Sequence, residues 1–381
     1  MSSKNVSWDY LPGEIVTNIL LLLPVKSILT CICVCKTWKS IIQNNTFVSS
    51  HLHSIINNNN HNHHLMFRIW SKSKQLYVLH NDDDDDNFTQ HTTFDFPFNG
   101  PGLKGMYTCN GLVCLSDFVY KFFLWNPCVK KCMELPSPNV TYKTHVWFKA
   151  SIGFGFDAKN NDFKVVRVVS PRHNADNADI QKDRPEVEVY SLSTGEWRMV
   201  TASLPPICLV KHCENQVYVN GAIHWLAFRR DDDYKKLHFV LVFDLGDEVF
   251  WEIPLPEIPE STHGGICELH AIYGNSIALL QRKSYFVSLN IWVMKEYGVV
   301  SSWTKVFAIV EQDVEPWPIG FRRNGQVVLK LKSGGLVSQD LESQERKDLR
   351  ITSGWISAFV DSYVESLVLL DKPANSSAVT Y

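Results

Sequence analysis

The 381-residue sequence contains no apolar run that approaches the roughly 20 residues needed to cross a bilayer. The longest candidate, Ile19 to Leu23, ends at Pro24. The N-terminus also lacks the apolar stretch and the small-residue cleavage site of a secretory signal. Positive charge is not in excess, because 37 Lys and Arg stand against 40 Asp and Glu. We therefore expect a protein of the cytoplasm or nucleus that binds neither a membrane nor a nucleic-acid backbone.

Motifs of catalysis and cofactor binding are missing as well. The sequence has no Gly-x-Ser-x-Gly elbow, no phosphate-binding loop, no His-Glu-x-x-His and no dinucleotide fingerprint. Its ten cysteines are scattered, and no pair is followed by a second His or Cys pair at zinc-finger spacing. We predict no catalytic residue, no metal ligand and no cofactor.

Two low-complexity stretches could suggest a metal site, but a solvated segment explains each of them better. Residues 51–64 end in an Asn/His tract and are predicted to form a linker, since no acidic or Cys ligands accompany the histidines. Residues 82–86 are five consecutive Asp, without the glycine and the spaced ligands of a calcium loop. They are predicted to form a charged hairpin tip.

Residues 1–50 are predicted to form a small helical unit. Pro12 and Pro24 each precede apolar residues at helical spacing, and a third helix is expected over residues 33–43. Roughly 40 residues in three helices make a poor independent core. We expect the unit to bury its remaining apolar face against a partner protein or against the domain that follows.

From residue 65 to the end, the pattern is that of repeated β-hairpins. Short runs rich in Val, Ile, Phe, Tyr and Trp are separated by turns in which left-handed backbone angles cost little. A second hairpin follows each of these turns, so a unit of about 50 residues holds four strands. The five recurring turns are Asn110-Gly111, Asn160-Asn161, Asn220-Gly221, Gly274-Asn275 and Asn324-Gly325.

A four-stranded unit at this period is typical of a β-propeller blade, which buries its faces only when blades stack in a ring. Five units are complete between residues 100 and 351. Strands from residues 65–97 and from the tail, residues 355–370, would close the ring as a sixth blade. The sequence predicts a mostly β fold with a small α N-terminal unit and a propeller of about six blades, although five or seven also fit.

Conspicuous side chains within the repeat have structural explanations. His224 lies on a predicted strand directly after a turn, with no nucleophile near it in sequence, and is predicted to be structural. Six tryptophans occupy strand positions that recur with the repeat, so we expect core packing and not a carbohydrate-binding surface. They are Trp125, Trp197, Trp225, Trp251, Trp292 and Trp303.

Both regions resemble known plant families. Leu11-Pro12-Gly13-Glu14-Ile15, Leu23-Pro24-Val25-Lys26-Ser27-Ile28 and Val34-Cys35-Lys36-Thr37-Trp38 are similar to an F-box. The rest resembles the F-box-associated interaction domain, a kelch-like propeller, in a group that includes the S-locus F-box proteins. The segments of this second resemblance are Cys109-Asn110-Gly111-Leu112-Val113-Cys114, Leu124-Trp125-Asn126-Pro127, Gly153-Phe154-Gly155-Phe156-Asp157, Asp162-Phe163-Lys164-Val165-Val166 and Asn220-Gly221-Ala222-Ile223-His224-Trp225.

The resemblance implies a non-catalytic substrate receptor of an SCF-type ubiquitin ligase. The F-box, residues 1–50, would bind a Skp-type adaptor and through it a cullin scaffold. The propeller, residues 65–381, would capture a target protein for ubiquitination and proteasomal degradation. The residues expected at the adaptor interface are Leu11, Pro12, Ile15, Leu23, Pro24, Val25, Ile28, Val34, Cys35 and Trp38. For Ile19, Leu20 and Trp38, a place in the core of the unit is expected about equally.

One alternative stays open, a stand-alone propeller that acts as a lectin or a hydrolase with the helices as a cap. It requires carboxylates or histidines that converge near the central channel, and the sequence shows no such repeated polar set. The target itself is unknown. Segments that connect strands and carry mixed charge, Pro and Gly are candidate target contacts, although solvated connectors explain them equally well. They are residues 172–184, 229–236, 256–265 and 312–317.

Overall fold

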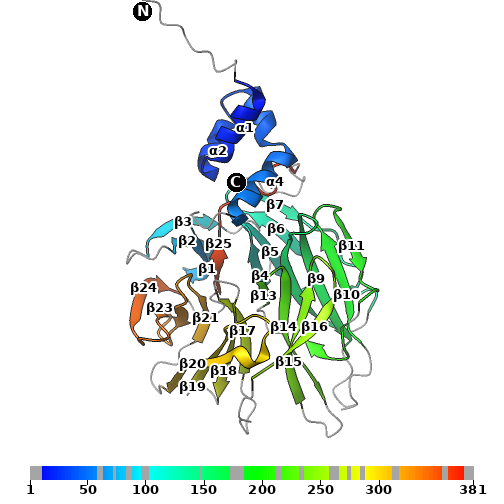
Figure 1. The fold of residues 1–381 in the computed structure, drawn as a ribbon, viewed down its shortest axis with the longest axis vertical. Helices are drawn as coiled ribbons and strands as arrows, with labels where there is room; N and C mark the ends of the chain where they lie inside the picture. The colour runs from blue at the N-terminus through cyan, green and yellow to red at the C-terminus, as the bar shows by residue number, and fades with distance from the viewer. Residues whose placement is uncertain are drawn as a thin grey trace, which may run out of the picture.

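A computed structural model shows a helical unit seated on a ring of six β-sheets (Figure 1). Among the described residues, no helix is long and apolar enough to span a membrane. The structure describes residues 11–57, 63–71, 74–82, 88–95, 103–145, 148–171, 184–203, 205–210, 216–230, 236–256, 266–272, 276–283, 288–310, 317–353 and 359–372.

The helical unit contains four helices and not the three predicted. They are α1 (Gly13–Leu21), α2 (Val25–Cys31), α3 (Lys36–Ile42) and α4 (Asn45–Asn57). Pro12 was predicted to open the first helix, and it stands at the N-cap of α1, while Pro24 stands at the N-cap of α2. The fourth helix corrects the predicted linker, because residues 51–57 form its second half. This segment is helical because Phe47, Leu52 and Ile55 share one buried face.

The ring consists of six antiparallel sheets, five of them four-stranded. The first holds β25 (Phe359–Tyr363), β1 (His64–Ser71), β2 (Lys74–Asn81) and β3 (Gln90–Asp95), and the second β4 (Leu103–Cys109), β5 (Leu112–Asp117), β6 (Phe122–Asn126) and β7 (Lys131–Glu134). The third holds β8 (Phe148–Asp157), β9 (Asp162–Pro171), β10 (Glu186–Ser191) and β11 (Glu196–Met199). The fourth holds β12 (Leu209–Val210), β13 (Val217–Val219), β14 (Ala222–Arg230), β15 (Lys236–Asp244) and β16 (Phe250–Pro254). The fifth holds β17 (Ile266–Ile272), β18 (Ser276–Lys283), β19 (Ser288–Met294) and β20 (Trp303–Val310), and the sixth β21 (Trp317–Phe321), β22 (Val327–Lys330), β23 (Gly335–Gln339) and β24 (Arg346–Thr352).

The sheet that holds β25 closes the ring with strands from both ends of the described chain. β25 pairs with β1 in antiparallel register, from His64 opposite Tyr363 to Arg68 opposite Phe359. We call this sheet the closing blade. The predicted six-bladed propeller and its closure are therefore confirmed.

The predicted Asn-Gly turns join the first two strands of their blades. Asn110 and Gly111 have φ values of 47° and 80°, and Asn220 and Gly221 have 52° and 76°. Gly111 is also required by close approach, since a Cβ there would lie 2.5 Å from the carbonyl oxygen of Val364. The predicted turn at Gly274-Asn275 lies outside the described residues.

The tryptophans pack between blades, as the sequence predicted. All six lie in or against apolar clusters of the ring. Three indoles also donate a hydrogen bond to a backbone carbonyl of the preceding blade. Trp197 Nε1 donates to Pro136 at 2.8 Å, Trp225 Nε1 to Ile152 at 2.9 Å, and Trp303 Nε1 to Pro254 at 3.2 Å. The recurring tryptophan therefore fixes neighbouring blades to one another.

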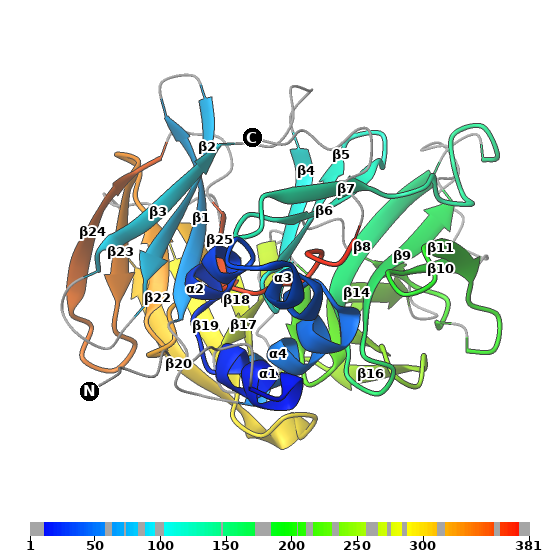
Figure 2. The same cartoon turned by 90° about the horizontal axis from the view of Figure 1, so that it is seen from above.

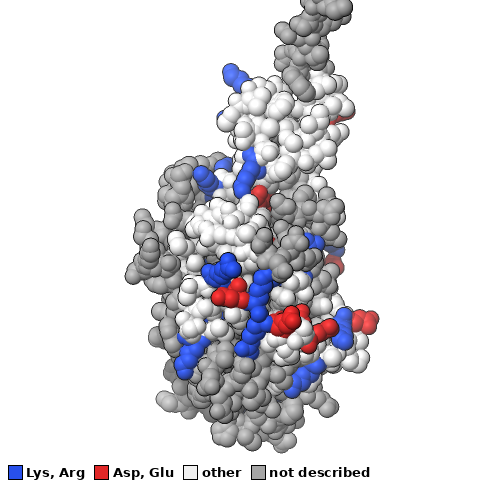
Figure 3. All heavy atoms as spheres, turned by 90° about the vertical axis from the view of Figure 1, so that its left-hand side faces the viewer, with Lys and Arg blue, Asp and Glu red and all other residues white. Residues whose placement is uncertain are grey.

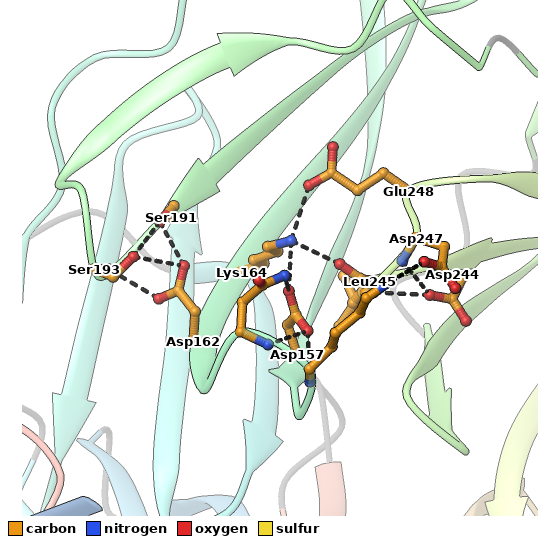
Figure 4. A network of polar contacts seen from close by, with 12 residues as sticks. Asp157, Asp162, Lys164, Ser191, Ser193, Asp244, Leu245, Asp247 and Glu248 are labelled. Atoms are coloured by element: carbon orange, nitrogen blue, oxygen red, sulfur yellow. Dashed lines mark hydrogen bonds and ion pairs between the residues drawn. The ribbon is translucent and has the colours of Figure 1, made fainter.

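A buried lysine connects the third and fourth blades. Lys164 Nζ lies 2.7 Å from Asp157 Oδ2 and 2.8 Å from Glu248 Oε1, and it donates to the Leu245 carbonyl at 2.6 Å (Figure 4). Burial alone would lower the pKa of Lys164, but hydrogen bonds to the two carboxylates outweigh it and raise the pKa. The ammonium therefore stays charged and holds the turn after β8 against the turn after β15.

Candidate adaptor-binding surface

The apolar side chains of α1 and of the residues beside it divide between two sides. Val16 and Leu20 point into the core of the helical unit and are 7% and 1% exposed. The side chains of the other face remain open to solvent. Leu11 is 38% exposed, Ile15 and Ile19 are each 45%, Leu22 is 85% and Val34, which precedes α3, is 61%. We call these five residues the outward surface. Large apolar side chains grouped in this way indicate a binding site for another protein.

The residues predicted for the adaptor interface differ in their exposure to solvent. Leu11, Pro12, Ile15, Pro24, Val34 and Cys35 are exposed, and Leu23 and Trp38 are half-buried. Val25 and Ile28, by contrast, are 5% and 0% exposed and lie in the core of the unit. In this chain both pack inside the unit, and their contact with an adaptor stays a prediction.

Leu22 is the most exposed apolar residue of the unit and was not among the predicted contacts. The run from Leu20 to Leu23 could have indicated it, because consecutive helical residues differ in direction by about 100°. One leucine of such a run must face outward. Leu20, for which core and contact were equally expected, belongs to the core, whereas Ile19 belongs to the outward surface.

The other side of the helical unit rests on the segment that follows β25. We call this segment, residues 364–372, the strap. Leu367 and Leu370 of the strap join the core formed by α1 to α4, and Cys128 and Val129 from the turn after β6 pack beside them. Figure 2 shows the helices over the centre of the ring. One side of the helical unit therefore packs against the propeller, and the other side is exposed to solvent.

Side chains of the second blade hold the strap in place. Asn126 Nδ2 donates to the carbonyls of Ser366 at 3.0 Å and Val368 at 2.8 Å. Lys131 Nζ donates to the Leu370 carbonyl at 2.8 Å. Asn126 belongs to the Leu-Trp-Asn-Pro segment of the sequence and is completely buried. Its amide thus fixes an irregular backbone that has no sheet partner of its own.

A polar contact joins α2 to the closing blade. Lys26 Nζ lies 2.8 Å from His91 Nε2 and 3.6 Å from Glu365 Oε1. His64 stacks on His91, with ring centroids 4.4 Å apart. Burial lowers the pKa of His64 to about 4, with a smaller contribution from His91 in the same direction, so that this imidazole is neutral at pH 7.

The face of the propeller away from the helices carries its own exposed apolar residues. The Asn110-Gly111 turn touches the strap, and Asn161 after β8 contacts Ser49 of α4 at 3.3 Å, so these turns mark the helical face. Successive antiparallel strands reverse direction, and the next connection in each blade lies at the opposite, far face. The exposed apolar residues at that far face are Phe118, Val119, Tyr142, Ile207, Leu237 and Trp317.

The four segments predicted as candidate target contacts follow or precede strand ends of the far face. Their residues 172–183, 231–235, 257–265 and 312–316 lie outside the described residues. The flanking strand ends are described and include Pro171, Arg230 and Trp317. The described residues do not test whether these segments contact a target, so this role stays a prediction.

A central channel of about 690 Å³ runs between the inner strands of the blades. Thr108 of β4 donates to Asp361 of β25 at 2.6 Å, and burial raises the pKa of this carboxyl to about 6. Arg322 pairs with Asp82 at 2.9 Å. Each of these contacts joins two blades and so serves closure of the ring. The lining of the channel also includes His64 and His270, so the alternative of a lectin or a hydrolase stays untested.

The structure tests the predictions made for Asp82 and His224. Asp82 was predicted at a charged hairpin tip but is 4% exposed and ion-paired with Arg322, which corrects the prediction for this residue. Residues 83–86 lie outside the described residues. His224 is structural as predicted, because it is fully buried, with Nδ1 3.1 Å from the Val217 carbonyl and Nε2 2.8 Å from the Tyr297 hydroxyl.

Comparison with known families decides what this arrangement is. A model described as the F-box associated beta propeller domain matches residues 64–370, and one described as the F-box domain matches residues 8–49. The chain belongs to the F-box-associated β-propeller family. Its helical unit up to residue 49 is therefore an F-box, and residues 364–370 of the strap lie within the family's propeller region.

Relatives of the same F-box family span nearly the whole chain. F-box protein At3g07870 of Arabidopsis thaliana is 28% identical, over 90% of this chain and 87% of its own length. F-box/kelch-repeat protein At3g23880 of the same plant is 26% identical, over 85% of this chain and 86% of its own. F-box protein CPR1, also of Arabidopsis thaliana, is 26% identical, over 94% and 89%. Each match extends over most of this chain.

Proposed function

We propose that this chain is the substrate receptor of an SCF-type ubiquitin ligase, acting in the cytoplasm or nucleus. The supporting observation is the outward surface of the F-box, which is apolar and free, while the other side of the F-box is committed to the strap. A Skp-type adaptor would bind this surface and connect the chain to a cullin scaffold. The propeller would hold a target protein for ubiquitination and proteasomal degradation, without catalytic groups of its own.

Charge on the F-box supports an interface with an apolar centre. On the face that Figure 3 shows, the described helical unit has few charged side chains, whereas Lys and Arg lie among Asp and Glu on the described part of the ring below. Apolar side chains at the centre of such a patch supply most of the binding free energy. Lys26 and Lys36 lie at exposed positions, where charge affects the association rate and orientation more than the affinity.

Substitution at the outward surface tests adaptor binding. Ile15→Ser and Val34→Ser should each raise the Kd for the adaptor at least about tenfold, because they remove exposed apolar contacts. Titration calorimetry with the purified full-length chain measures the affinity. Val249→Ser is the matched control, since Val249 is similarly exposed, at 42%, but lies on the propeller. Equal affinities for all three variants would show that the adaptor does not use this surface.

The far face is the proposed site of target binding. It is the face away from the F-box, and Phe118 and Val119 are each 62% exposed in its turn between β5 and β6. An adaptor on the F-box would leave this face accessible. Aromatic and aliphatic groups presented on a rigid turn are suited to be anchors in a protein interface.

A paired variant tests this second step. Phe118→Ser with Val119→Ser should deplete the proteins that co-purify with adaptor-bound receptor, while the Kd for the adaptor stays unchanged. Quantitative mass spectrometry of the captured proteins, against Val249→Ser as control, measures the effect. An unchanged set of captured proteins would exclude this turn from target binding.

A further inference from the structure

Two histidines and one glutamate meet where the F-box touches the closing blade. His64 begins β1, His91 lies in β3, and Glu365 lies in the strap. One ligating atom from each of the three lies within 4.8 Å of the other two. His91 Nε2 and Glu365 Oε1 are 3.5 Å apart, close to the separation of about 3.3 Å between two ligand atoms of a tetrahedral Zn²⁺ ion. The ladder that closes the ring fixes the backbone at this point.

His64 is a buried ring with an unsatisfied nitrogen. The residue is 2% exposed, and its Nδ1 atom has no hydrogen-bond partner. A buried polar atom without a partner is costly and needs an explanation. Coordination of a metal ion would give this imidazole a partner.

A cation from the F-box already lies at this position. The Lys26 ammonium faces both His91 Nε2 and Glu365 Oε1, and 63% of the Lys26 side chain is exposed. A largely exposed lysine can swing into solvent without disturbing the core. An ammonium and a metal ion at the same two ligands would repel each other, so only one of them can be present.

We propose that His64, His91 and Glu365 form a binding site for a divalent transition-metal ion such as Zn²⁺, and that the Lys26 ammonium occupies this site in the metal-free protein. Two imidazoles and one carboxylate are a common Zn²⁺ ligand set and leave a fourth position for water. The site lies outside the proposed adaptor and target surfaces. The Asn/His tract pointed to His64 as a possible ligand, but sequence spacing could not indicate His91 and Glu365, because closure of the ring brings the three together.

Metal titration of the full-length chain tests the site. In a background with Cys33→Ser and Cys35→Ser, which removes exposed thiols, we expect one Zn²⁺ per chain that is lost or weakened more than about tenfold by His91→Ala and by Glu365→Gln. His145→Ala is the matched control, because His145 also pairs with a carboxylate, Glu186, at 3.4 Å, and no third His, Cys, Asp or Glu joins them among the described residues. Thermal unfolding in the absence of metal verifies that each variant is folded.

The titration either supports or overturns the metal site. Loss of one bound ion in both ligand variants, and not in the control, supports the site. Absence of binding at about 100 µM Zn²⁺, or binding that is equal in all variants, overturns it. If His91→Ala does not fold, Glu365→Gln alone decides, because Gln keeps the size of the side chain and removes its charge.

Lysine labelling tests the second half of the proposal. Acetylation of Lys26, measured by mass spectrometry, should become several-fold faster when Zn²⁺ is added, because the ammonium is displaced. Lys121 is the internal control, since it is 60% exposed and pairs with Glu134 at 3.6 Å, much as Lys26 pairs with Glu365. A Lys26 to Lys121 labelling ratio that Zn²⁺ leaves unchanged would overturn the proposed occupation by Lys26.

Discussion

At the scale of single residues, one ion pair inside the ring is completely buried. Arg167 and Glu188 are completely buried and hydrogen-bonded to each other. Arg167 also donates to the Val140 carbonyl at 3.0 Å, and Glu188 accepts from the Asn139 backbone at 2.8 Å. The pair therefore joins the third blade to the connection from the second.

Loss of one partner should be severe. We expect Arg167→Met to lower the free energy of unfolding by roughly 3–5 kcal/mol, because Glu188 is left buried without its counter-charge. Urea unfolding, followed by tryptophan fluorescence, measures it. The double variant Arg167→Met with Glu188→Met should recover part of this loss. A single variant as stable as the wild type would contradict the structural role of the pair.

Some residue assignments could not be made from the sequence. Val25 and Ile28 fit an adaptor interface by type and position, yet both are buried. Short helices that are apolar on several faces do not indicate which face meets the partner and which meets the protein's own core. That choice was decided by the strap, which is distant in sequence.

At the scale of elements, the strap connects the two parts of the chain. It has no regular secondary structure beyond turns, but Leu367 and Leu370 complete the core of the F-box. Its backbone is fixed by Asn126, some 240 residues away in the sequence. The F-box thereby obtains the apolar contacts that about 40 residues cannot supply alone.

Truncation of one strap leucine tests this connection. Leu367 is 1% exposed, and Leu367→Ala should cost about 2–5 kcal/mol of the stability of the F-box, since it leaves a cavity in that core. Hydrogen exchange should show faster exchange in α1 to α4, while the strands of the third and fifth blades stay protected. Leu11→Ala, at an exposed position, is the control. Equal exchange in both variants would contradict the role of the strap.

Two elements escaped prediction for physical reasons. The second half of α4 is followed by an Asn/His tract, whose composition indicates a linker, and its helix depends on tertiary burial of Leu52 and Ile55. The tail, residues 355–370, was predicted to supply two strands, but residues 364–370 form no strand, because Leu367 and Leu370 pack into the core of the F-box. The blades and the first three helices were predictable, since their apolar period and turn residues are local.

At the scale of the whole molecule, the ring separates two surfaces. The F-box and the strap occupy one face, and Phe118, Val119 and the other exposed apolar residues lie at the far face. The number of blades and the closure were predictable because a repeat of about 50 residues has few architectures. The target was not predictable, because recognition depends on side chains at irregular connections.

The most direct test of the central claim is a titration of the purified full-length chain with a Skp-type adaptor. The wild type should bind in a one-to-one complex. The double variant Leu11→Ala with Pro12→Ala should bind at least about tenfold more weakly, with an unchanged thermal unfolding profile. A well-folded wild type that does not bind the adaptor would contradict the account, and the F-box would then serve only the propeller.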